Sequence, residues 1–139
     1  MDMDEKELVR LAKEARQHAY APYSHFKVGA ALLTHSGKIY KGCNVENASF
    51  GATNCAERTA FFKAVSEGEN SFAAIAIVGA PGGTDTADTC APCGICRQVM
   101  REFCQPEDFK IVLEDGQGGT ISMTLEELLP RSFAGESMG

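Results

Sequence analysis

No run of apolar residues in the 139-residue chain is long enough to cross a bilayer, since a transmembrane helix needs about 20 such residues in a row. The N-terminus is acidic and lacks the basic and apolar segments of a secretory signal or transit peptide. We therefore expect no contact with membranes and a cytoplasmic location.

Basic residues are also scarce. The chain has 13 lysines and arginines against 19 aspartates and glutamates, which gives a net charge of −6. Proteins that bind nucleic acids normally carry a basic stripe. This charge balance argues against a nucleic-acid partner and favours a small substrate that is uncharged or weakly charged.

Cysteine, in contrast, is plentiful. Without a secretory signal, and with 44% hydrophobic residues to build an ordinary core, the cysteines indicate reduced thiols used for metal binding or catalysis rather than a disulfide scaffold. The six cysteines are at positions 43, 55, 90, 93, 96 and 104.

Hydrophobic periodicity and turn residues predict one domain over residues 1–139 in the order α-β-β-α-β-α-β-β-α. This order is typical of a mixed sheet between helices, a three-layer α/β/α fold. Glycine-rich 79–89 is expected to be a loop, and 131–139 a loose tail apart from Phe133. The expected helices cover 4–19, 55–67 and 93–103, with a short one from 124 to Pro130, and the expected strands cover 26–33, 38–45, 72–78, 109–114 and 120–123.

Gly29 and Gly42 lie inside two of these expected strands. Glycine within a strand indicates a bulge or a close approach of the backbone, for example to a ligand.

Two cysteine groups stand where helices are expected to begin: Cys55, followed by Glu57, and the pair Cys93 and Cys96. Helix N-termini stabilise thiolates. Three thiolates on Zn²⁺ leave one tetrahedral position for water, which distinguishes a catalytic zinc from a closed structural one. We therefore predict a zinc site formed by these three cysteines.

The Cys-x-x-Cys pattern alone is also typical of a redox pair. Cys90 extends the run to Cys-x-x-Cys-x-x-Cys, which occurs in iron–sulfur proteins, but Pro92 interrupts the run and the usual fourth cysteine is missing. We expect Cys90 not to bind the metal.

Glu57 and Arg58 flank the first predicted ligand. Glu57 is placed to move protons between a water and a substrate, although Asn54-x-x-Glu57 is also a capping-box pattern. Three thiolates on Zn²⁺ leave the site at −1, so we expect the Arg58 guanidinium to donate hydrogen bonds to one or two of the sulfurs.

Four motifs together resemble the small, homotetrameric, zinc-dependent cytidine deaminases, and the resemblance runs from about residue 5 to Phe133. The Cys-Ala-Glu and Pro-Cys-x-x-Cys motifs are the signature of zinc nucleobase deaminases, with cysteine in place of histidine as the first ligand. The four motifs are Phe26-Lys27-Val28-Gly29-Ala30-Ala31, Gly42-Cys43-Asn44-Val45-Glu46-Asn47-Ala48, Asn54-Cys55-Ala56-Glu57-Arg58-Thr59-Ala60 and Ala91-Pro92-Cys93-Gly94-Ile95-Cys96-Arg97-Gln98.

This resemblance implies a five-stranded mixed sheet and hydrolysis of cytidine or 2′-deoxycytidine to the uridine counterpart, with Glu57 as the general acid and base. It also implies that Asn44 and Glu46 bind the ribose. As residues i and i+2 of an extended segment, these two side chains point the same way.

The resemblance also implies that the Phe26 ring packs against the nucleoside and that the Ala56 backbone contacts the pyrimidine carbonyl. It further implies that a neighbouring subunit supplies Phe133, and that Phe50 borders the subunit contacts. The expected assembly is therefore a homotetramer with composite active sites.

Three alternatives remain open from the sequence. A deaminase of a cytosine nucleoside antibiotic such as blasticidin S has the same metal motif, although Asn44-Val45-Glu46 favours a simple nucleoside. A polynucleotide deaminase is disfavoured by the acidic charge. A non-enzymatic zinc-stabilised binding module needs a fourth protein ligand, for which Cys90 is the nearby candidate.

Overall fold

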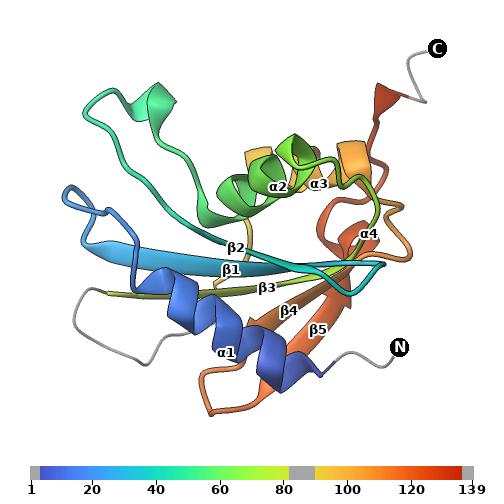
Figure 1. Cartoon of the computed structure of the whole chain (residues 1–139), viewed down its shortest axis with the longest axis horizontal. Helices are drawn as coiled ribbons and strands as arrows, with labels where there is room; N and C mark the ends of the chain where they lie inside the picture. The colour runs from blue at the N-terminus through green and yellow to red at the C-terminus, as the bar shows by residue number, and fades with distance from the viewer. Residues whose placement is uncertain (1–3, 82–89, 136–139) are drawn as a thin grey trace.

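The computed structural model describes residues 4–81 and 90–135, which form a five-stranded sheet with helices on both faces (Figure 1). The elements are α1 (Glu5–Arg16), β1 (Phe26–Thr34), β2 (Ile39–Cys43), the 3₁₀ helix η1 (Phe50–Ala52), α2 (Ala56–Ser66), β3 (Phe72–Pro81), α3 (Gly94–Phe103), β4 (Lys110–Glu114), β5 (Thr120–Thr124) and α4 (Leu125–Leu128). The strand order is β2-β1-β3-β4-β5. The pair β3 and β4 is parallel and the other pairs are antiparallel, which confirms the predicted mixed α/β/α fold.

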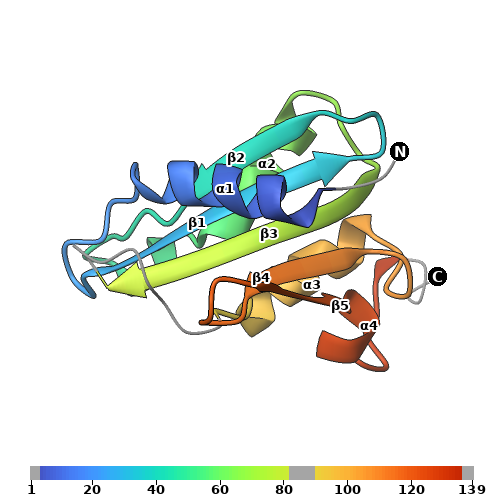
Figure 2. The ribbon, with the colours of Figure 1, turned by 90° about the horizontal axis from the view of Figure 1, so that it is seen from below.

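The helices divide between the two faces of the sheet. Figures 1 and 2 show α1 across one face and α2 and α3 on the other. The apolar stripe of α1 faces the sheet, and the side chain of Asp4 caps its N-terminus by accepting hydrogen bonds from the N–H groups of Lys6 and Glu7. No helix within the described ranges combines the length and the apolar character that crossing a membrane requires.

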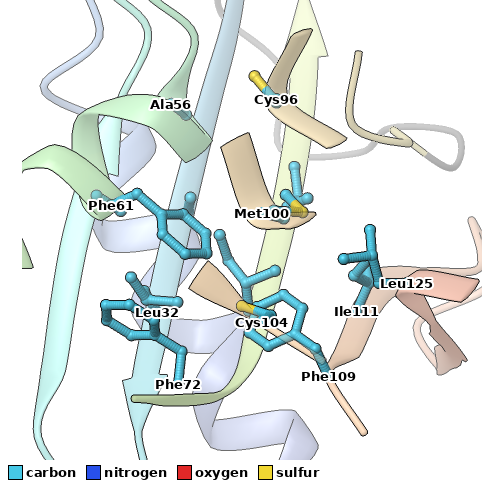
Figure 3. Packing of buried hydrophobic residues seen from close by; sticks show 14 of the residues in the cluster. Leu32, Ala56, Phe61, Phe72, Cys96, Met100, Cys104, Phe109, Ile111 and Leu125 are labelled. Carbon is cyan, nitrogen blue, oxygen red and sulfur yellow. The ribbon is translucent and has the colours of Figure 1, made fainter. Parts of the chain in front are cut away.

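The larger apolar core lies between the sheet and the helices α2 and α3. Phe61 of α2, which is fully buried, packs against Phe72 and Phe109 with ring centroids 5.0 and 5.9 Å apart. Ala56 and Cys96 lie at one end of this core, on α2 and α3 (Figure 3). Because both helices pack on the same core, their N-terminal ends are held beside each other.

Two glycines let the helices approach the sheet closely. A Cβ atom on Gly29 would overlap the Ala12 carbonyl oxygen of α1, and one on Gly42 would lie 2.5 Å from both the Ala56 carbonyl oxygen and the Ala60 nitrogen of α2. The predicted close approach is confirmed, and its partners are helices of the same chain.

Several predicted boundaries are wrong because tertiary pairing overrides the local pattern. The first helix ends at Arg16 rather than at residue 19, and Tyr20 then pairs with Val45. The third strand continues past residue 78 to Pro81, since residues 79–81 pair with the start of β1. The helix η1 was not predicted.

Two segments predicted to be irregular are more ordered than expected. The loop predicted over 79–89 is wrong for 79–81, and 82–89 lie outside the described residues. The tail predicted to be loose from residue 131 is hydrogen-bonded to α3 at Ser132 and Phe133. Residues 136–139 are likewise outside the described part.

Candidate metal centre

Three cysteine sulfurs meet between the N-terminal ends of α2 and α3. The Sγ atom of Cys93 lies 3.6 Å from that of Cys55 and 3.3 Å from that of Cys96, and all three sulfurs lie within 4.8 Å of one another. Among the described residues, this trio is the group of histidine, cysteine and acidic side chains that could hold a metal ion. The structure thus brings together the three predicted ligands.

The donor set fits zinc. A tetrahedral site with Zn–S bonds of about 2.3 Å separates its sulfurs by about 3.8 Å, close to the spacing of these thiols. Cys55 and Cys93 are the N-cap residues of α2 and α3, where the helix dipoles favour negative charge, and the Sγ atom of Cys93 accepts a hydrogen bond from the N–H of Cys96. Three sulfur ligands are also fewer than the four of a closed structural site.

Arg58 contributes positive charge beside the sulfurs. Its Nη2 donates to the Sγ of Cys55 and to the Thr53 carbonyl oxygen, both at 3.4 Å. Hydrogen bonds from Cys96 and then from Arg58 lower the pKa of Cys55 to about 5, against the opposing effect of burial. The contact with Cys55, together with burial, raises the pKa of Cys96. The predicted contact between Arg58 and a thiolate is therefore present.

Glu57 projects from the first turn of α2 and is only 4% exposed. Burial, followed by the negative charge of Cys55, raises the pKa of Glu57, while its own backbone N–H acts against the rise. The capping-box alternative is not formed, because Cys55 rather than Asn54 is the N-cap and the Asn54 amide donates to Thr59. A capping box with Asn54 therefore does not account for Glu57.

Cys90 is not one of the sulfurs of the metal-binding trio. A Cβ atom on Gly79 would come within 2.8 Å of the Cys90 sulfur and 2.7 Å of the Phe26 ring, so sulfur and ring both contact the backbone at Gly79. Burial raises the pKa of Cys90 to about 11, which keeps it protonated near neutral pH. This placement agrees with the prediction that Cys90 is not a ligand.

Asn44 and Glu46 both hold the segment that precedes and begins β1. The side chain of Asn44 accepts from the N–H of Val28 and donates to the Phe26 carbonyl oxygen, each at 2.9 Å. The carboxylate of Glu46 accepts from the N–H groups of Tyr23 and Ser24 at 2.9 and 3.1 Å and from the Ser24 hydroxyl. These bonds lower the pKa of Glu46, with the Ser24 hydroxyl contributing most.

A pocket of about 380 Å³ opens beside Glu46. It is close to the metal-binding trio along the chain, because Thr53 in its wall is two residues before Cys55. Sequence reasoning missed most of these residues, since they come from irregular segments without a periodic signal. The pocket is lined by Tyr23, Ser24, Glu46, Asn47, Phe50 and Thr53.

The remaining predicted contact residues differ in exposure. Phe26 is 37% exposed, whereas the Ala56 side chain is fully buried and its N–H belongs to the first turn of α2, where such groups lack partners within the helix. Phe50 and Phe133 are 82% and 59% exposed. Aromatic residues this exposed are available to a partner.

Comparison with known proteins agrees with this geometry. Residues 2–112 match the family model of the cytidine and deoxycytidylate deaminase zinc-binding region. The chain is 52% identical to the cytidine deaminase of Halalkalibacterium halodurans over 98% of both chains, and 48% identical to that of Sporosarcina psychrophila over 98% of this chain and 96% of the relative.

Solved structures show the same relationship. The crystal structure of cytidine deaminase from Burkholderia pseudomallei superposes with a TM-score of 0.84 at 51% identity, and the match covers 94% of this chain and 100% of that one. The structure of cytidine deaminase from Mycobacterium tuberculosis superposes with a TM-score of 0.79 at 38% identity, over 95% of this chain and 98% of that one. The chain therefore belongs to the cytidine and deoxycytidylate deaminase zinc-binding family.

Proposed function

We propose that this chain is a zinc-dependent cytidine deaminase that hydrolyses cytidine and 2′-deoxycytidine to uridine and 2′-deoxyuridine, releases ammonia and serves pyrimidine salvage. The observation that supports this most directly is the meeting of three cysteine sulfurs beside a buried glutamate. This arrangement occurs in a chain whose near full-length relatives are cytidine deaminases.

Cys55, Cys93 and Cys96 would hold the zinc ion, which when bound supplies a water acidified for attack on C4 of the base. Glu57 takes the first proton of the attacking water and delivers it to N3. It then takes the proton of the hydroxyl group formed on C4 and delivers it to the amine, which leaves as ammonia while C4 becomes a carbonyl. The burial of Glu57 supports this role, because burial raises the pKa of the carboxyl group and so favours proton uptake from the water.

The sugar occupies the pocket beside Glu46, whose volume lies within the about 300–1,000 Å³ typical of small-molecule sites. Asn44 and Glu46 each retain capacity for one more hydrogen bond: a carboxylate offers about four acceptor sites, and an amide offers two N–H donors. These groups bind the ribose hydroxyls. The ring of Phe26 packs against the nucleoside, and the N–H of Ala56 donates to the pyrimidine carbonyl.

The active enzyme is a homotetramer with composite sites. The exposure of Phe50 and Phe133 supports this assembly, because burying an exposed aromatic ring against a second copy is favourable. Phe133 of one subunit then covers the base bound by its neighbour. Light scattering coupled to size-exclusion chromatography tests the assembly, and a monomer at micromolar concentration contradicts it. The cytoplasmic location and the absence of a nucleic-acid partner stay predictions.

The reaction is tested by following the ultraviolet absorbance of cytidine with the purified protein, with and without a zinc chelator. We expect loss of cytidine that stops after chelation and returns with added zinc. Blasticidin S and single-stranded DNA serve as comparison substrates. Turnover of either one in preference to cytidine and deoxycytidine contradicts the proposed substrate class.

A further inference from the structure

Arg97 joins the metal-binding turn to the C-terminal part of the chain. Its Nε donates to the carbonyl oxygen of Pro92, the residue before Cys93, at 2.8 Å. Its Nη1 donates to the carbonyl oxygen of Leu128, the last residue of α4, at 2.9 Å. The final carbonyl groups of a helix have no hydrogen-bond partner within it, and Arg97 supplies one for the last residue of α4. The same side chain holds the turn that leads to Cys93, a predicted metal ligand.

The same helix α3 also binds the segment that follows α4. The Gln98 amide donates to the Phe133 carbonyl oxygen, and Nε of Arg101 donates to the Ser132 hydroxyl, both at 2.9 Å. Ala134 beyond them is buried. The backbone at Phe133 is thus attached to α3, whereas its ring is exposed. Figure 2 shows this C-terminal segment alongside α3 and α4.

We propose that Arg97 and Gln98 are positioning residues that couple zinc binding at Cys93 and Cys96 to the order of the C-terminal segment 128–133. Zinc binding in one subunit thereby fixes the position of the Phe133 ring, which covers the substrate bound by the neighbouring subunit. The second part of this inference rests on the proposed function, because it assumes the composite active site.

The coupling follows from the order of the contacts. Zinc fixes the sulfurs of Cys93 and Cys96 against Cys55 of α2, so it also fixes the turn at Pro92 and the first turn of α3. Arg97 and Gln98 follow directly and transmit this position to Leu128 and Phe133. When zinc is removed, weak contacts between thiols are left in place of metal–sulfur bonds, and the order of the segment should fall.

Hydrogen exchange measured on the full-length protein tests the coupling without relying on activity. Peptides covering 128–135 are compared in zinc-loaded and chelated protein, with peptides from β1 as an internal reference for general destabilisation. We expect exchange in 128–135 to rise on chelation by several-fold more than in β1 and to return with zinc. Equal changes in both regions, or no change in 128–135, overturn the proposal.

Variants locate the coupling. Arg97→Lys retains the charge but places all its donors on one nitrogen, so it cannot reproduce the two-ended bridge. We expect both Arg97→Lys and Gln98→Ala to keep the native zinc content. In both zinc-loaded variants, the amide hydrogens of residues 128–135 should nevertheless exchange as fast as in the chelated native protein. The matched control Arg10→Lys, on the exposed face of α1, should behave like the native protein. Native-like exchange of residues 128–135 in both Arg97→Lys and Gln98→Ala would overturn the proposal.

Kinetics then separate this inference from the proposed function. Gln98→Ala should raise the KM for cytidine by about two- to tenfold, the range that one hydrogen bond supplies, with little change in kcat. An unchanged KM would overturn the claim that the order of segment 128–133 in one subunit affects substrate binding in the neighbouring subunit. If the native protein does not deaminate cytidine but its exchange depends on zinc as described, the proposed function fails and the coupling stands.

Discussion

The sulfur atoms of Cys55 and Cys93 lie 3.6 Å apart although 38 residues separate them in the chain. Both residues cap helices that pack on the same apolar core, so their proximity is built into the fold. The third sulfur, of Cys96, follows one turn later on α3 and completes the trio.

We predict that Cys93→Ser loses zinc, whereas Cys90→Ser keeps it. The first change removes one of the three converging sulfurs, and the second removes a thiol that lies against Gly79 and outside the trio. Zinc content per chain, measured by atomic absorption after dialysis, distinguishes the two variants. Loss of zinc from Cys90→Ser would instead indicate a closed four-sulfur site and a structural metal.

Glu57→Gln should retain zinc and lose activity. The amide has nearly the same shape as the carboxyl group but cannot carry protons, and general acid–base steps contribute about 10²–10⁴-fold to rate. Cytidine turnover and zinc content are measured on the same preparation. Turnover within a few-fold of the native rate would show that Glu57 has only a structural role.

Arg58→Met should weaken zinc binding. The change removes the N–H that donates to the Cys55 sulfur and that helps to lower the pKa of Cys55, so protons compete better for the thiolate. Loss of a group that hydrogen-bonds a ligand typically reduces metal affinity by about 10–100-fold. Competition with a chromophoric chelator measures the effect, with Arg10→Met on the exposed face of α1 as the control. Equal affinities in the two variants contradict the role of Arg58.

Gly42→Ala should destabilise the protein and displace the start of α2. The added methyl group would lie 2.5 Å from the Ala56 carbonyl oxygen and the Ala60 nitrogen, and overpacking of this kind costs about 1–3 kcal/mol in the free energy of unfolding. Gly51→Ala is the matched control, because a Cβ atom there meets no atom within 4 Å. Urea unfolding measures the free energy of unfolding of both variants. Equal values for Gly42→Ala and Gly51→Ala would contradict the close packing at Gly42.

The contribution of Glu46 to stability should depend on pH. Bonds from the Ser24 hydroxyl and from the N–H groups of Ser24 and Tyr23 hold its pKa in the folded state below the ordinary 4.5. A lowered pKa means that the ionised form stabilises the fold above pH 4.5, and that this contribution is lost as the pH falls through the folded value. The difference in unfolding free energy between native protein and Glu46→Gln should therefore shrink between pH 6 and pH 3. A difference that is constant or grows toward pH 3 contradicts the assignment.

Local patterns in the sequence predicted the α/β order, the helix starts at Cys55 and Cys93, and the choice of thiol, carboxylate and guanidinium groups for the centre. These features depend on residue chemistry and on contacts between near neighbours in the chain. Even the close approach at Gly42 was indicated by a single glycine within a strand, although its partner, α2, was not.

Other features were decided only by the tertiary structure, because they depend on contacts between segments that are distant in the chain. The extension of β3 to Pro81 depends on pairing with β1, and the place of Cys90 beside Gly79 depends on that extension. The hydrogen bond from the Gln98 side chain to the Phe133 carbonyl oxygen joins residues that are 35 positions apart in the sequence. Neither kind of contact leaves a periodic pattern, because its energy arises only after packing has brought separate elements together.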